Sequence, residues 1–320
     1  CDAATLAAAA PAVPAPGVIA LIRKLAAAAA FSLLSAASAA PAPQETDAEL
    51  ARSAARIEAH VRFLADDLLE GREAGTRGHD LAALYVATKF RLMGLEPAGE
   101  NGSFFQTVPM RSGTLLRDGA RLTVAREGSV TELVFEEDFL PSVNFDTGEC
   151  ALEAPMVFVG QGVYAPELEH DDFAGVDLRG KVAVLLANAP ARFPNDQRAF
   201  HASGLEKLRE LERRGAVGAL FLGDPENEAR RAWHLNAPNW ARPGMRLLDR
   251  DGRPRDTFPG LGCRASMRMQ RAEVIFAGAP HTTDEVWTML AEGRLRAFDL
   301  KGTIAMASRA RLEPVASRNV

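Results

Sequence analysis

The side chains that could do chemistry are few in this sequence and are spread along it. The six histidines include no pair four residues apart and no His-Glu-x-x-His string, the helical arrangement that holds a catalytic zinc ion. A two-metal hydrolase needs about five His, Asp and Glu ligands, with a further carboxylate as general base. We therefore predict no catalytic residue and no metal ligand in this chain. The histidines are His60, His79, His170, His201, His234 and His281.

The densest polar cluster is His170-Asp171-Asp172. These side chains could hold a metal ion, but adjacent residues on one loop rarely converge on a single ion. We prefer to interpret the cluster as a solvated turn or a helix N-cap. His79, at the start of a predicted helix, is interpreted as a cap or surface residue rather than as a ligand.

Nucleophilic catalysis has no clearer basis in the sequence. No Gly-x-Ser-x-Gly elbow occurs, and Ser112, Ser129 and Ser142 have no histidine close by in sequence. Of the three cysteines, Cys150 and Cys263 could form a disulfide in an oxidising compartment or remain as free buried thiols. Both alternatives stay open at this point.

The elements best placed to organise the chain are two predicted helices joined by a glycine-rich loop. The first helix has an apolar face formed by Ile57, Val61, Leu64 and Leu68. The second has an apolar face formed by Leu81, Leu84, Tyr85, Thr88 and Leu92. Gly71 and Gly94 can end these helices. The glycines of the loop predict positive φ or a close backbone approach, and an ordinary connecting turn is the alternative.

The stretch from Phe63 to Gln106 resembles the N-terminal signature of the secreted zinc aminopeptidases that carry an inserted protease-associated domain, metallopeptidase family twenty-eight. The match consists of FLADDLLEGREAGTRGHDLAALYV at 63–86, followed by Met93–Gly99 and Asn101–Gln106. The resemblance implies an enzyme in which a hydroxide bridging two zinc ions removes N-terminal residues from peptides. The family's metal ligands would lie after Val320, so none is assigned to this chain.

The resemblance also gives the glycine-rich loop a functional interpretation, as a border of the substrate cleft in the complete enzyme. The residues concerned are Gly71, Arg72, Gly75, Thr76 and Gly78. A simpler interpretation of Arg72 and Arg77 is that they are solvated loop charges.

A strand–helix–strand unit is predicted further along the chain. Its elements are strands at 155–159, 182–186 and 216–222 and a helix at 203–214 that opens with a capping-box spacing. The order implies a right-handed parallel crossover. Residues 177–186 and 208–224 resemble the protease-associated domain. The Gly160-Gln161-Gly162 string lacks the third glycine and the helix of a dinucleotide-binding loop.

Antiparallel strands are predicted on either side of this unit. The first set lies at 104–110, 115–124 and 131–135, with a turn at Arg117-Asp118-Gly119. Near the end of the chain, a capped helix at 282–290 precedes an exposed strand at 303–312.

The predicted fold class is therefore α/β (mixed α+β), in which the leading helices of an incomplete zinc-peptidase domain accompany a protease-associated domain. Residues 1–39 are assigned to an upstream extension and a signal peptide, and residues 40–150 to the N-terminal part of the peptidase domain. Residues 151–300 are assigned to the protease-associated domain. Residues 301–320 are assigned to a return strand toward a metal-binding half beyond Val320.

Charge and hydropathy limit the partners and the location. With 37 Lys and Arg against 42 Asp and Glu, and no basic stripe, no nucleic-acid partner is predicted. Arg23-Lys24, an apolar run at 25–34 and Ala37-Ser38-Ala39 form the three parts of a secretory signal peptide, so we expect an exported protein, periplasmic or extracellular. The run is shorter than the roughly 20 residues of a spanning helix, so no stable membrane span is expected.

The sequence thus predicts the N-terminal part of an exported zinc aminopeptidase. Two zinc ions and a peptide substrate would belong to the complete enzyme, and no cofactor is expected on this chain. The alternative is a non-catalytic binding or receptor-like module with the same architecture.

Overall fold

The computed structural model describes residues 46–320. The predicted upstream extension and signal peptide at 1–39 lie outside the described residues. The chain divides into two compact units, Cys1–Asp66 and Asp67–Val320. Among the described residues, no helix is both long and apolar enough to cross a bilayer.

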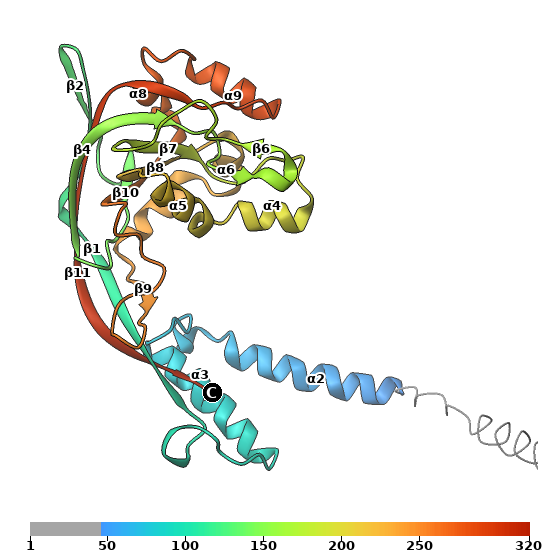
Figure 1. The fold of residues 1–320 in the computed structure, drawn as a ribbon. Coiled ribbons are helices and arrows are strands. Elements are labelled where there is room, and N and C mark those ends of the chain that lie inside the picture. Colours follow the sequence, from blue (N-terminus) through green and yellow to red (C-terminus); the bar gives the residue numbers. More distant parts are fainter. Residues whose placement is uncertain (1–45) are drawn as a thin grey trace, which may run out of the picture. The chain divides into compact units, whose positions relative to one another are not determined.

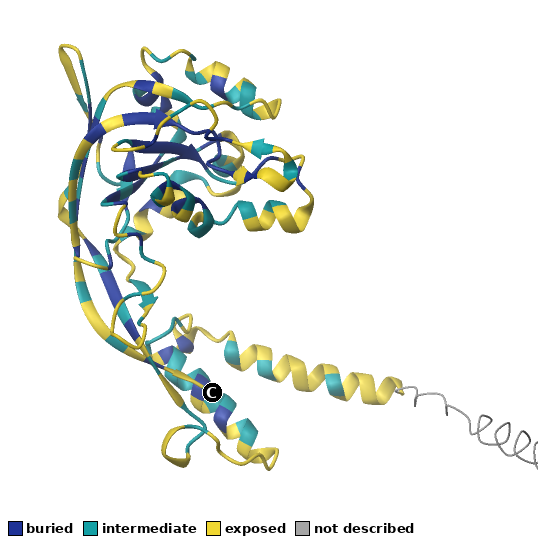
Figure 2. Cartoon of the chain, viewed as in Figure 1, coloured by how far each residue is buried: buried dark blue, intermediate teal, exposed yellow. Residues whose placement is uncertain are grey.

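The first unit contributes helix α2 (Asp47–Leu64), which begins with the predicted capping box. The Thr46 hydroxyl accepts a hydrogen bond from the Glu49 N–H, and the Glu49 carboxylate accepts one from the Thr46 N–H. This reciprocal pair satisfies two backbone donors that have no partner inside the helix. No residue of α2 is buried (Figure 2).

The prediction that this helix continues to Gly71 was wrong, because α2 ends at Leu64. Leu68, which was placed on the helix face, lies in a 3₁₀ turn at Asp67–Leu69 and is 81% exposed, whereas Leu69 is 4% exposed. Glu70, Gly71 and Arg72 all have positive φ. Three consecutive residues in this region cannot continue a right-handed helix.

The second unit is built on a mixed nine-stranded sheet, which confirms the mixed α/β class (Figure 1). The strand order is β2-β1-β11-β4-β7-β8-β10-β3, and β9 pairs with β1. A separate two-stranded sheet consists of β5 (Tyr164–Ala165) and β6 (His170–Asp171). The strands of the large sheet are β1 (Gln106–Arg126), β2 (Ser129–Glu132), β3 (Phe139–Pro141), β4 (Glu149–Phe158), β7 (Val182–Leu186), β8 (Gly218–Leu222), β9 (Gly244–Leu247), β10 (Cys263–Met267) and β11 (Phe298–Asn319).

Two long strands differ from the short ones that the sequence predicts. β1 runs unbroken through the expected turn at Arg117–Gly119, where its pairing with β11 shifts register between Leu116 and Arg121. β11 is not an exposed strand, because it pairs with β1 on one side and with β4 on the other. Its partners lie far away in sequence, so local alternation could not show that it is an interior strand.

The predicted parallel crossover is confirmed, since β7 and β8 pair in parallel and helix α5 (Gly204–Arg213) connects them. Every residue of β7 is fully buried, because the sheet has an apolar cluster on each face. Val182, Val184 and Leu186 belong to one cluster. Ala183 and Leu185 belong to the other. This alternation follows from the two-residue period of a strand.

The helix ends show where local sequence rules hold and where they fail. The capping box at Thr282 is present and starts α9 (Thr283–Ala291). At Ser203 the predicted capping box is absent, because the serine side chain makes no cap hydrogen bond. The remaining helices of this unit, apart from short 3₁₀ turns, are α3 (Arg77–Leu92), α4 (Asn195–His201), α6 (Pro225–Arg230), α7 (Trp233–Asn236) and α8 (Ala272–Phe276).

Helix α3 buries a different face from the predicted one. Its buried residues are Gly78, Ala83 and Ala87, whereas Leu84 and Leu92 are more than half exposed. Burial on this helix falls on small residues, which an apolar pattern based on leucine positions does not reveal.

The predicted domain boundaries near residues 150 and 300 fall inside β4 and β11, so one sheet continues across both. The assignment of residues 151–300 to a protease-associated domain stays a prediction.

Cys150 and Cys263 form a disulfide with Cα atoms 5.5 Å apart, which settles the alternative that the sequence left open. The bridge joins the start of β4 to the start of β10 across 113 residues of sequence.

Closing so long a loop restricts the unfolded chain, so replacing both cysteines by serine should lower the free energy of unfolding by about 2–4 kcal/mol. Urea denaturation of the oxidised protein, the reduced protein and the double variant checks this. Reduction should have the same effect as the two substitutions. An oxidised protein whose Cys150 and Cys263 both react with a thiol reagent before unfolding would contradict the bridge.

Candidate functional site

The glycine-rich loop lies between the 3₁₀ turn and helix α3. Gly71 and Gly75 have φ values of +80° and +78°, a region that glycine occupies without steric cost. At Gly78 the constraint is different, since a β-carbon there would lie 1.7 Å from the Leu69 carbonyl oxygen. Positive φ and close backbone approach, the two reasons expected for these glycines, are therefore both present.

The loop is fastened to the last residues of β11, about 240 positions away in sequence. The Gly75 N–H donates to Ser317 Oγ at 3.1 Å, and a β-carbon on Gly75 would lie 2.3 Å from Val315 Cγ1. His79 Nε2 lies 2.8 Å from the Arg318 carbonyl oxygen. His79 thus connects the start of α3 to β11, a role that its interpretation as a cap or surface residue missed.

The remaining predicted loop residues divide into a helix cap and an exposed arginine. Thr76 is the N-cap of α3, and its hydroxyl accepts from the His79 N–H at 3.5 Å and donates to the Glu73 carbonyl oxygen at 2.6 Å. Arg72 is exposed, and within residues 46–320 its side chain makes no hydrogen bond or ion pair. That these residues border a substrate cleft stays a prediction.

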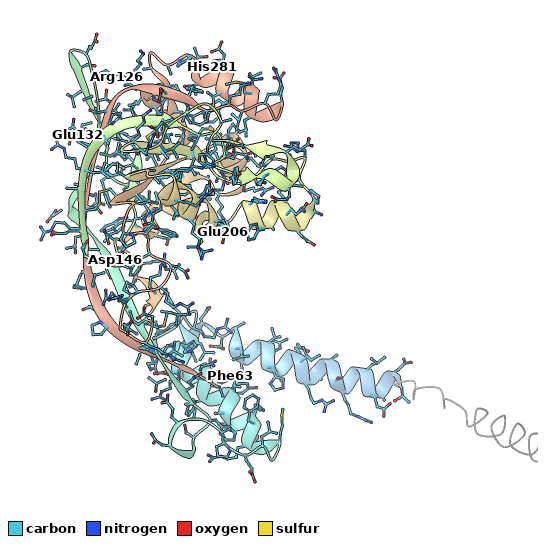
Figure 3. All side chains as sticks on the ribbon, in the orientation of Figure 1. Phe63, Arg126, Glu132, Asp146, Glu206 and His281 are labelled. Atoms are coloured by element: carbon cyan, nitrogen blue, oxygen red, sulfur yellow. A yellow bond between two sulfur atoms is a disulfide. The ribbon has the colours of Figure 1, made fainter. Side chains whose placement is uncertain are left out.

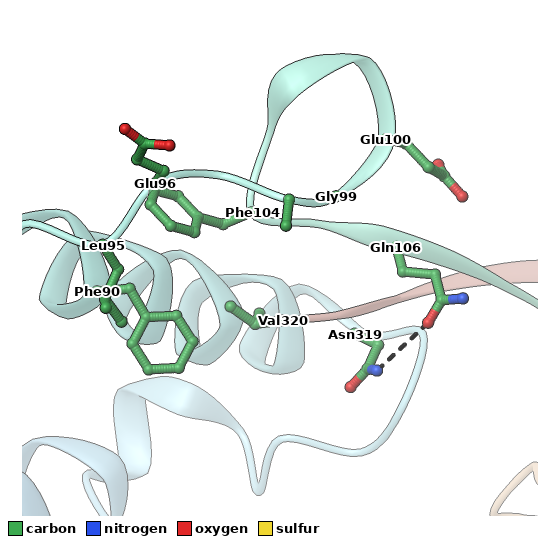
Figure 4. A pocket seen from close by; sticks show the side chains of 10 residues that line it. Phe90, Leu95, Glu96, Gly99, Glu100, Phe104, Gln106, Asn319 and Val320 are labelled. Carbon is green, nitrogen blue, oxygen red and sulfur yellow. Dashed lines mark hydrogen bonds between the residues drawn. The ribbon is translucent and has the colours of Figure 1, made fainter.

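A hollow of about 750 Å³ lies where the end of α3 meets the ends of β1 and β11 (Figure 4). Apolar side chains of Phe90, Leu95 and Phe104 line part of it, and Asn319 Nδ2 donates to Gln106 Oε1 at 3.5 Å. The Thr107 hydroxyl and N–H both donate to the Glu100 carboxylate, which holds the pKa of Glu100 below its ordinary value. The hollow is thus lined by apolar side chains and by the two carboxylates of Glu96 and Glu100.

A second crevice, of about 520 Å³, lies beyond the carboxyl ends of the parallel strands β4 and β7. Open parallel sheets bind ligands at this edge because the loops after neighbouring strands meet there. Trp287 and Leu290 of α9 form an apolar wall. Arg198 and Glu226, which are 3.6 Å apart, contribute opposite charges.

The loops at this edge are held by a buried lysine that the sequence analysis did not single out. Lys207 of α5 is 2% exposed, and its ammonium group donates to the carbonyl oxygens of Gln161, Leu186 and Asn188. Three N–H donors meet three carbonyls from the segments that follow β4 and β7. Burial lowers the pKa of Lys207 to about 8, opposed by the charges of Asp172 and Asp224.

Asp172 fixes the same loop from the other side. Its buried carboxylate accepts hydrogen bonds from the N–H groups of Gln161 and Val163, at 3.1 and 3.0 Å. His170 Nε2 lies 3.0 Å from the carboxylate without hydrogen-bond geometry. His170 Nδ1 faces Arg192 Nη2 at 3.3 Å. The preferred interpretation as a solvated turn or helix N-cap was wrong, because His170 and Asp171 form strand β6 and Asp172 is buried.

The sequence carried one signal that could have identified Lys207. It stands four residues before Leu211, which is buried, so the two side chains share the inner face of α5. A lysine on the apolar face of an amphipathic helix requires a partner or a cluster of acceptors. Asp172 gave no comparable signal, because its partners are backbone groups in a loop.

Within the part of the chain that the structure describes, no three His, Cys, Asp or Glu side chains are grouped so as to hold a metal ion. The crevice combines an apolar wall, paired charges and loops held by Lys207 and Asp172.

No family model and no curated protein matches the chain. Among solved structures it is similar to an aminopeptidase from Aneurinibacillus sp. strain AM-1, at 15% identity and a TM-score of 0.39, over 83% of this chain and 46% of that one. It is also similar to BSAP, a zinc aminopeptidase from Bacillus subtilis, at 15% identity and a TM-score of 0.30, over 81% and 45%. The chain spans about half the length of these structures, and likenesses this low say nothing about its activity.

Gly75→Ala should destabilise the protein for two separable reasons. An alanine at positive φ costs about 1 kcal/mol, and the clash with Val315 adds about 1–3 kcal/mol. Gly71→Ala is the matched control, since Gly71 has the same positive φ but open space around its Cα. Thermal melts of both variants and of Gly75→Ala with Val315→Ala measure the difference. Equal melting temperatures for the two single variants would disprove the close packing against β11.

Lys207→Met should destabilise the protein by about 3 kcal/mol or more at pH 7, because three buried carbonyls lose their donor. The difference in the free energy of unfolding between wild type and Lys207→Met should grow as pH rises. The folded-state pKa of about 8 lies below the unfolded value of about 10.4. Between these two pH values the unfolded chain binds more protons, so the wild type gains stability relative to the variant.

Urea denaturation of wild type and Lys207→Met at pH 7, 8, 9 and 10 tests the pH dependence. Lys301→Met, which removes an exposed lysine, is the control for the loss of one positive charge. A stability difference between wild type and Lys207→Met that is constant with pH would refute the lowered pKa.

Proposed function

We propose that this chain is the N-terminal part of an exported zinc aminopeptidase, a hydrolase that removes N-terminal residues from peptides. The proposal rests on the residues at 63–106, which resemble the signature of that enzyme family, and on those at 177–186 and 208–224, which resemble its protease-associated domain.

The observation that carries the proposal is the contact between the signature stretch and the predicted return strand, which are far apart in sequence. The glycine-rich loop contacts the final residues of the chain through Gly75 and Ser317. The end of the signature at Gln106 pairs with Asn319 in the first register position of β1 and β11. Contact between the signature and the strand that leads toward the predicted metal-binding half is expected if the two act together in the complete enzyme.

Zinc would belong to the complete enzyme rather than to this chain. Residues 46–320 lack a group of three side chains suited to a metal ion, so no catalytic step is assigned to them. Their contribution would be to position a peptide beside the metal-binding half, with Arg72 and its neighbouring glycines at the border of the cleft.

A second candidate function is a non-catalytic binding module. The crevice beyond β4 and β7 favours it, because its apolar wall at Trp287 and its fixed loops are typical of a binding site. On this view peptide or protein recognition, rather than hydrolysis, would be the purpose of the architecture.

Turnover of aminoacyl 4-nitroanilides by this chain and by the complete product of its gene separates the two functions. The chain alone should show no turnover with or without added zinc. The complete product should show turnover that is lost with a chelator and restored by zinc. In that enzyme, Arg72→Ala should lower kcat/KM with little change in melting temperature.

Three results would count against the proposal. Zinc-dependent turnover by this chain alone would reveal a metal site within it. Turnover in the complete product that is unaffected by a chelator would indicate a different chemistry. An inert complete product that binds peptides would favour the second candidate.

A further inference from the structure

Away from both hollows, three arginines gather around one short loop. Arg111 of β1 and Arg246 of β9 are directly opposite each other in the antiparallel register, so both side chains point to the same face of the sheet. Arg264 of β10 reaches the same loop from another strand. Like charges directly opposite each other on neighbouring strands are destabilising unless something compensates for them.

The loop around which they gather is firmly built. Phe145 is 4% exposed, and its ring packs over the glycine pair Gly113 and Gly244, where a β-carbon on either residue would crowd it. The Arg246 guanidinium lies 4.7 Å from the centre of that ring. Arg111 Nη1 donates to the Phe145 carbonyl oxygen at 2.9 Å. Two guanidinium groups are thereby held on a rigid platform.

The third arginine adds to the positive charge. Arg264 Nη2 donates to the Val143 carbonyl oxygen at 3.2 Å. Burial lowers the pKa of Arg264, and the nearby charge of Arg246 lowers it further. Asp146 and Glu212 act in the opposite direction but form no ion pair with it. All three arginines are half-buried, where an uncompensated charge is costly.

The hydrogen bonds of the three arginines do not neutralise their positive charges. Within the described residues, none of the three guanidinium groups has a carboxylate oxygen within 4.0 Å. They donate to backbone carbonyl oxygens, including that of Gly252 for Arg111 and that of Met245 for Arg246. Each guanidinium has five N–H donors in a planar fork, so several donors remain for a ligand.

We propose that Arg111, Arg246 and Arg264 form a binding site for an oxyanion, a carboxylate or a phosphate group, beside the Phe145 platform. Guanidinium forks bind both groups through paired hydrogen bonds, and a compact ammonium group would do so less well. The anion neutralises the repulsion between Arg111 and Arg246. The site is separate from the glycine-rich loop and does not depend on the proposed peptidase function.

Isothermal titration calorimetry and thermal melts at constant ionic strength test the site, with sodium succinate and sodium phosphate as probes and chloride as background. At least one probe should bind the wild type and raise its melting temperature as its concentration rises. The stronger probe identifies whether carboxylate or phosphate is the preferred group. Arg246→Gln should weaken that binding on the order of tenfold, because it removes charge-assisted hydrogen bonds.

Arg309→Gln is the matched control, since it removes an exposed arginine from β11 of the same sheet. It should leave the affinity unchanged. Arg246→Lys, which keeps the charge but loses the planar fork, should bind more weakly than wild type. If neither probe binds, or if Arg246→Gln and Arg309→Gln reduce binding equally, the three arginines only fasten the loop and the proposal fails.

Discussion

The pairing of β1 with β11 is the contact on which the rest of the second unit depends. It runs from Gln106 and Asn319 at one end to Ala125 and Thr303 at the other. Nearly two hundred residues separate the paired segments, so forming the ladder closes a long loop and is entropically costly. The ladder also brings the glycine-rich loop to Ser317. Its strand β11 pairs antiparallel with β4, and the parallel strands of the sheet continue from β4.

The buried and half-buried charged side chains of this unit have two different kinds of surroundings. Lys207 donates to three carbonyl oxygens, and the charges of Asp172 and Asp224 partly oppose the lowering of its pKa by burial. Arg111 and Arg246 face each other and bond to carbonyls without a carboxylate partner. The first arrangement holds loops in place, whereas the second leaves guanidinium donors without a carboxylate partner, which is the basis of the proposed anion site. Figure 3 draws the side chains as sticks and labels Asp146, which follows Phe145 in the loop that the arginines contact, and Glu206, which precedes Lys207 on α5.

Many local elements could be predicted from the sequence because their causes are local. Thr46 and Thr282 start helices through hydrogen bonds that span three residues. The apolar run at 182–186 predicted the strand that became β7, and the spacing to β8 predicted a parallel crossover. The glycines of the loop predicted unusual backbone geometry, which is present at Gly75 and Gly78 for two different reasons.

By itself, then, the sequence determined the mixed α/β class, the crossover and the glycine-rich loop, since each depends on residues near one another in the chain. Only the tertiary structure decided that Cys150 and Cys263 pair, that β11 is an interior strand and that α3 buries Ala83 and Ala87. It also decided where charges such as Lys207 find their partners. The physical reason is that these outcomes depend on contacts between distant segments, and neither hydrophobic period nor turn chemistry records which distant segment will be adjacent.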